Sequence, residues 1–123
     1  MNQGLVRLCR TDEVADGEAR GFDPWHSGRD SVFVVNHHGR LRAWRDACPH
    51  YGDVPMAWRK NAYLNVDRTR IICAAHGAQF DIETGLCTLG PCLGQGLQGV
   101  ELTITPDNDI YIRGWDGADQ PRL

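Results

Sequence analysis

Residues 48–76 read CPHYGDVPMAWRKNAYLNVDRTRIICAAH, and the interpretation of the whole chain depends on this stretch. It opens with Cys48-Pro49-His50 and closes with Cys73-Ala74-Ala75-His76, and 22 residues, 51 to 72, separate the two motifs. Each motif supplies one thiolate and one imidazole, ligands that select zinc, copper or iron over magnesium or calcium. The candidate metal ligands are therefore Cys48, His50, Cys73 and His76.

Two mixed cysteine–histidine pairs are typical of one kind of iron–sulfur cluster. In Rieske [2Fe-2S] centres, two histidines replace two cysteines on one of the irons. The chain resembles the small soluble Rieske ferredoxins over residues 30–113, in its two cluster loops and in the segment expected to cover the cluster: Cys48-Pro49-His50-Tyr51-Gly52, Cys73 to Asp81, Thr84-Gly85 and Gly90-Pro91. The resemblance implies one [2Fe-2S] cluster per chain, with both cysteines on one iron and both histidines on the other.

A structural zinc site is the main alternative for the same residues, since two cysteines and two histidines are a standard tetrahedral zinc set. Zinc sites usually keep like ligands together, however, as C-x2-C and H-x3-5-H pairs. Mixed pairs in both halves fit that pattern poorly. A third reading, in which the four residues bind no metal and belong to the core, ranks below zinc. We therefore favour the cluster over a zinc-stabilised interaction module.

The spacer between the motifs is longer than in common Rieske ferredoxins. We place the excess around residues 57–63, which include the basic, aromatic segment Trp58-Arg59-Lys60. A longer surface loop costs little closure entropy, so the cluster site need not change. The segment is either a docking patch for a partner or a solvated loop with a buried tryptophan, and we favour the loop because most charge runs are solvated surface.

The composition argues against a nucleic-acid-binding, membrane or exported protein. The chain has 123 residues, 41% of them hydrophobic, and a net charge of −3, which predicts one modest domain and argues against a nucleic-acid partner. No stretch approaches 18 consecutive apolar residues and no secretory segment opens the chain, so we expect neither membrane insertion nor export. Five cysteines without a signal peptide predict reduced thiols in the cytoplasm: Cys9, Cys48, Cys73, Cys87 and Cys92. Of these, we expect Cys87 and Cys92 to be small buried hydrophobes.

Short alternating segments with frequent Gly and Pro turns predict an all-β fold. The resemblance makes this a single Rieske domain over 1–123, with stacked antiparallel sheets and a cluster-binding part at about 46–94. Residues 11–30 are expected to form a loop with one helical turn, 37–40 a hairpin turn and 90–96 a covering loop. The expected strands are 5–9, 31–36, 41–44, 69–73, 79–82, 100–105 and 110–113.

The residues expected beside the cluster predict a low potential. High-potential members of the family carry a serine and a tyrosine whose hydroxyls donate to sulfur, and here those positions are Ala78 and Phe80. The disulfide that braces the two loops in those members would fall near Asp53 and at Ala75, and neither is cysteine. Without these donors the added electron is less stabilised, so we expect a midpoint near the lower end of the Rieske range.

The resemblance implies a one-electron carrier without its own substrate site, passing electrons from a flavin-dependent reductase to a terminal oxygenase. The alternative is a small Rieske subunit of a larger reductase, as in nitrite reductase. An oxygenase would need a further mononuclear iron site, and only His26, His37 and His38 remain after the cluster ligands. We expect the outward edges of His50 and His76 to form the docking tip.

Overall fold

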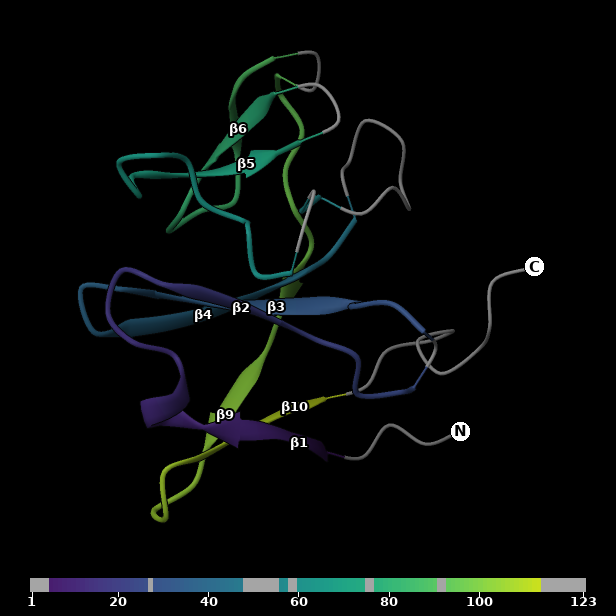
Figure 1. Cartoon of the computed structure of the whole chain (residues 1–123), viewed down its shortest axis with the longest axis vertical. Helices are drawn as coiled ribbons and strands as arrows, with labels where there is room; N and C mark the ends of the chain where they lie inside the picture. Colours follow the sequence, from purple (N-terminus) through teal and green to yellow (C-terminus); the bar gives the residue numbers. More distant parts are fainter. Residues whose placement is uncertain are drawn as a thin grey trace.

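The computed structural model describes residues 5–26, 28–47, 56–57, 60–74, 77–90 and 93–113. These residues form three antiparallel sheets, which Figure 1 shows stacked in layers, and the all-β prediction is confirmed. The elements are β1 (Leu5–Arg10), the 3-10 helix η1 (Thr11–Glu13), β2 (Ala19–Phe22), β3 (Val32–His37), β4 (Arg40–Arg45), β5 (Arg70–Cys73), β6 (Ala78–Asp81), β7 (Cys87–Leu89), β8 (Gly99–Val100), β9 (Leu102–Ile104) and β10 (Asp109–Arg113). In this part of the chain, no helix has the length and hydropathy needed to cross a bilayer.

The middle layer is the sheet β2-β3-β4-β8, and β3 is its fully covered strand. Side chains alternate across a strand, so the run Val32-Phe33-Val34-Val35 sends two residues to each face. Phe33 and Val35 join one core, and Val32 and Val34 join the other. An unbroken apolar run of this kind is what a strand buried on both faces requires.

The base sheet, β1-β10-β9, packs against one face of the middle layer (Figure 1). Ile110 and Ile112 of β10 are fully buried in this core, and Trp25 is partly buried against it. Trp25 therefore packs against the edge of this core. The neighbouring His26 is exposed.

The third sheet, β5-β6-β7, packs on the opposite face of the middle layer and comes from the chain between β4 and β8 (Figure 1). Its core contains Ile71, Cys73, Ala78 and Phe80, together with Trp44 of β4. Because β4 and β8 are neighbours in the middle sheet, the chain leaves that sheet after Arg45 and returns to it at Gly99. The segment with the candidate ligands is thus anchored at both ends on one pair of strands.

Three predictions of secondary structure need correction. Residues 19–22 are a strand, β2, and not part of a loop, because they pair with the edge of β3 from Ala19↔Val35 to Phe22↔Val32. The predicted strand 100–105 is divided at Glu101, where the chain passes from the middle sheet to the base sheet. The short strand β7 was not predicted, and it forms by pairing with β6.

The predicted hairpin turn after β3 is confirmed. His38 and Gly39 have φ values of 56° and 84°, the left-handed pair that a tight two-residue hairpin requires. The rings of His37 and His38 stand 4.1 Å apart and tilted. No group of three or more histidine, cysteine or acidic side chains gathers into a metal-binding cluster among the described residues, so nothing there supports a metal site at this turn.

Candidate metal centre

Cys73 is the one candidate ligand that lies within the described residues; Cys48, His50 and His76 lie outside them. Cys73 ends β5 and is fully buried. The N–H of Gly77 donates to the carbonyl of Cys73 at 2.8 Å. Gly77 has φ 71°, a left-handed conformation that glycine adopts without strain. Cys73 and Gly77 are therefore held together where β5 ends and β6 begins.

The face of the third sheet around Cys73 is apolar. Cys73 pairs directly with Ala78 across β5 and β6, and Ile71 pairs with Phe80. All of these side chains are fully buried on the same face. A Cβ on Gly90 would come within 2.9 Å of Ala78 Cα, so the backbone directly after β7 packs closely against Ala78 of β6. A fully buried thiol on an apolar face fits a cluster ligand, and neither Ala78 nor Phe80 offers a side-chain hydrogen-bond donor.

The first motif is bracketed by Asp46 and Met56. Asp46 is the buried charged side chain of the described residues, with 4% of its surface exposed. The N–H of Met56 donates to Asp46 Oδ1 at 2.9 Å, and the hydroxyl of Tyr63 donates to Oδ2 at 2.7 Å. Burial raises the pKa of Asp46 above its ordinary value, while these two donors act to lower it. No motif in the sequence singles out Asp46.

Tyr63 lies in the segment interpreted as the longer spacer, yet it is a core residue. Its ring stacks on Phe33, with centroids 4.1 Å apart and planes inclined by 7°, and it is 1% exposed. Burial, with the neighbouring Asp46 carboxylate, raises the pKa of the Tyr63 hydroxyl, which therefore acts as a donor. Tyr63 stands between the apolar Ala62 and Leu64, but the sequence does not show which carboxylate its hydroxyl would reach.

Lys60, the one residue of Trp58-Arg59-Lys60 that the structure describes, binds the middle layer. Its ammonium donates to the Gly21 carbonyl at 2.9 Å and to Asp30 Oδ2 at 2.9 Å. The next residue, Asn61, accepts the Gly21 N–H at 2.8 Å. Lys60 is therefore engaged within the chain, and the docking-patch interpretation gains no support from it.

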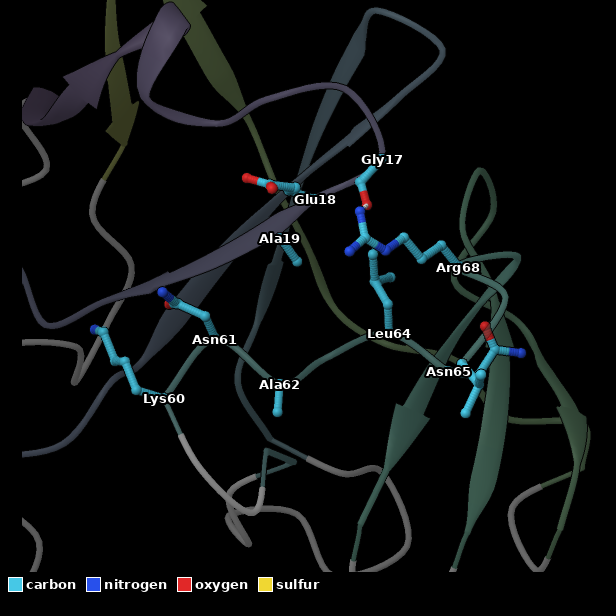
Figure 2. Close-up of a pocket in the computed structure, with 10 residues that line it drawn as sticks. Gly17, Glu18, Ala19, Lys60, Asn61, Ala62, Leu64, Asn65 and Arg68 are labelled. Carbon is cyan, nitrogen blue, oxygen red and sulfur yellow. Dashed lines mark hydrogen bonds between the residues drawn. The ribbon is translucent and has the colours of Figure 1, made fainter.

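Farther along the same segment, Arg68 contacts the chain just before β2. Arg68 Nη1 donates to the Gly17 carbonyl at 3.3 Å, and Figure 2 shows the guanidinium reaching toward that oxygen across a pocket. Asn61 and Arg68 have left-handed φ values of 65° and 62° and turn the chain at both ends of this segment. Residues 60–68 thus cover the edge strand of the middle sheet, an edge that would otherwise present unpaired backbone groups.

The structure tests the predicted burial of Cys87 but not that of Cys92. Cys87 is buried, with 7% exposed, as predicted, whereas Cys92 lies outside the described residues. Cys9, which no motif singled out, is buried in the base core, where burial raises the pKa of its thiol to about 11. A thiol with so high a pKa is a poor ligand and a poor nucleophile at neutral pH.

Gly21 provides the space in which Tyr63 reaches Asp46. A Cβ at position 21 would lie 2.4 Å from the Tyr63 hydroxyl and 2.5 Å from Asp30 Oδ2. We expect Gly21→Ala to lower the free energy of unfolding by about 1–3 kcal/mol, as overpacking usually does. Gly99→Ala is the matched control, since its Cβ meets Trp44 at an ordinary 3.6 Å. Denaturant unfolding of both variants checks this, and equal stabilities would contradict it.

Comparison with known proteins gives the family. A sequence model of the Rieske [2Fe-2S] domain matches residues 4–106. The chain is 36% identical over 80 residues to the ferredoxin component of the alkene monooxygenase system of Xanthobacter autotrophicus, covering 65% of this chain and 59% of that protein. It is 32% identical over 88 residues to the ferredoxin component of the p-cumate 2,3-dioxygenase system of Pseudomonas putida, covering 72% and 69%.

The structural comparison agrees with this. The Sphingomonas yanoikuyae B1 ferredoxin superposes with a TM-score of 0.65 at 25% identity, over 91% of this chain and all of that one, 100%. The ferredoxin of carbazole 1,9a-dioxygenase from Nocardioides aromaticivorans IC177 gives a TM-score of 0.65 at 22% identity, over 88% of this chain and 95% of that one, and shows the shared fold. The chain belongs to the Rieske [2Fe-2S] domain family.

Proposed function

We propose that the protein is a Rieske ferredoxin, a one-electron carrier that takes electrons from a flavin-dependent reductase and passes them to a terminal oxygenase. One [2Fe-2S] cluster per chain supplies the redox chemistry, as the family implies. The observation that carries the proposal is the position of Cys73, fully buried at the end of β5 and opposite Ala78 on a covered apolar face. The function needs no substrate site of its own, so we do not expect catalysis by the isolated protein.

The proposed ligands are Cys48 and Cys73 on one iron and His50 and His76 on the other. Supporting this assignment, Cys73 stands at the end of β5, and the Gly77 N–H, directly after position 76 in the sequence, binds the Cys73 carbonyl. The cluster-binding part is proposed to span about 46–94 within a single domain. The outward edges of the two histidines remain the proposed docking tip.

The partner assignment follows the relatives. The two sequence relatives are named as ferredoxin components of oxygenase systems, although the chain spans only 59% of the first of them. One similar structure, with a TM-score of 0.69 at 21% identity, is a complex of reduced oxygenase and oxidised ferredoxin. We propose a partner pair of the same kind here, a location in the cytoplasm and a role without nucleic acid.

Anaerobically purified protein tests the proposal directly. We expect about two iron atoms and two acid-labile sulfides per chain, and a rhombic EPR signal after reduction. The reduced protein should then be reoxidised by a Rieske-type terminal oxygenase and reduced again by a flavin reductase with NADH. A colourless protein with one zinc would refute the cluster. Stoichiometric copurification with a large reductase would instead support the subunit alternative.

A further inference from the structure

A hydrogen-bonded bridge runs from the first ligand segment to the second through Met56. The N–H of Met56 donates to Asp46 Oδ1 at 2.9 Å, and the carbonyl of Met56 accepts the N–H of Ala74 at 2.8 Å. Asp46 lies two residues before Cys48, and Ala74 directly follows Cys73. Met56 is fully buried, so water does not compete for these bonds.

A second bridge starts from the other oxygen of the same carboxylate. The Tyr63 hydroxyl donates to Asp46 Oδ2 at 2.7 Å, and the Tyr63 carbonyl accepts the N–H of Ile72 at 2.8 Å. Stacking on Phe33 fixes the tyrosine ring, which is 1% exposed. The two bridges therefore end on Ile72 and Ala74, the residues on either side of Cys73.

We propose that Asp46 is a positioning residue that fixes the two ligand segments relative to each other. Its carboxylate is itself anchored, because the N–H of Asp46 donates to the Ser31 carbonyl of the middle layer at 3.0 Å. Both oxygens of the side chain accept a buried donor, so one side chain ties Met56 and Tyr63 to the same point. A link of this kind can hold two loops in register in a chain with no cysteine at Asp53 or Ala75.

The consequence concerns how firmly the cluster is held. A cluster bound by two segments requires those segments to lie at a fixed separation. Groups around the ligands also tune how tightly the cluster is bound and its reduction potential. Loss of the carboxylate leaves the Met56 N–H and the Tyr63 hydroxyl buried without this acceptor, a costly arrangement that relaxes when the segments separate. This inference rests on the proposed ligand set.

The test compares iron release and redox properties of holo-protein variants. Asp46→Ala is expected to speed iron loss to a chelator about tenfold or more, and to shift the midpoint potential and broaden the reduced EPR signal. Tyr63→Phe keeps the stacked ring and removes one bridge, so it should lie between wild type and Asp46→Ala. Asp46→Asn keeps an acceptor for the Met56 N–H and should lie closer to wild type than the alanine variant.

Val34→Ala is the control for a general loss of stability. Val34 is fully buried in the other core, against the base sheet. This variant should melt earlier yet retain the wild-type potential and EPR spectrum. If Asp46→Ala and Tyr63→Phe behave like Val34→Ala, the positioning role is wrong; should Asp46→Ala fail to fold, Tyr63→Phe and Asp46→Asn decide alone. If the wild-type protein lacks acid-labile sulfide, the proposed function itself is wrong. If the wild-type protein holds the cluster but the variants keep the wild-type potential and EPR spectrum, only the positioning role is wrong.

Discussion

Replacement of Cys73 with alanine is expected to abolish cluster binding, with iron and acid-labile sulfide falling from about two each per chain to near zero. One iron would keep a single thiolate, and alanine has no group that could replace the missing one. Because cluster binding and folding are coupled, the variant should also melt at a lower temperature than the holo-protein. Iron and sulfide analysis, visible absorption and calorimetry on anaerobic preparations measure these effects.

Cys87→Ala is the matched control for this experiment. Cys87 lies on β7 of the same third sheet, is 7% exposed and pairs with Phe80 of β6. Its replacement removes one buried sulfur atom and should cost some stability, but the cluster content should stay at the wild-type level. A cluster retained by Cys73→Ala, or lost only from Cys87→Ala, would show that the assignment of ligands is wrong.

Introduction of hydroxyl donors beside the cluster is expected to raise its midpoint potential. Ala78 pairs directly with Cys73 and lies on the same buried face. A serine hydroxyl there could donate to cluster sulfur and stabilise the reduced state. If one such bond favours the reduced form by about 1.4 kcal/mol, the potential rises by roughly 60 mV for one electron. Ala78→Ser should therefore show an upward shift of this order in a redox titration.

Phe80→Tyr tests the second position in the same way. Phe80 is fully buried and lies two residues along β6 from Ala78, so its side chain shares that face. We expect a further upward shift of similar size, together with some loss of stability from the added oxygen in a packed core. Gln79→Ser is the control, because position 79 points to the opposite face of β6. An equal shift in the control, or none at Ala78 and Phe80, would contradict this account.

Several elements were predictable because their signals are local. The apolar run at β3, the His38-Gly39 turn and the alternation in β10 each specify a conformation within a few residues. The type of cluster was predictable for a similar reason. Ligand chemistry depends on residue types and on their spacing within each motif, and two mixed cysteine–histidine pairs match few other metal sites.

The elements that were missed depend on partners far along the chain. The segment Ala19–Phe22 contains a glycine and an arginine and has no clear alternation, and it is a strand because β3 offers it an edge. The division at Glu101 likewise follows from the pairing of β8 with β4 and of β9 with β10. Strand pairing at such distances is a property of the folded chain rather than of local propensity.

The amino-acid sequence by itself determined the family, the cofactor class and the candidate ligands, since these depend on which side chains are present and at what spacing. Only the tertiary structure decided that Asp46 and Tyr63, 17 residues apart, meet in a buried hydrogen bond, and that their links end on both sides of Cys73. The physical reason is that a carboxylate and a phenol ordinarily prefer water. They remain buried here because the three layers, once packed, leave each of them a partner.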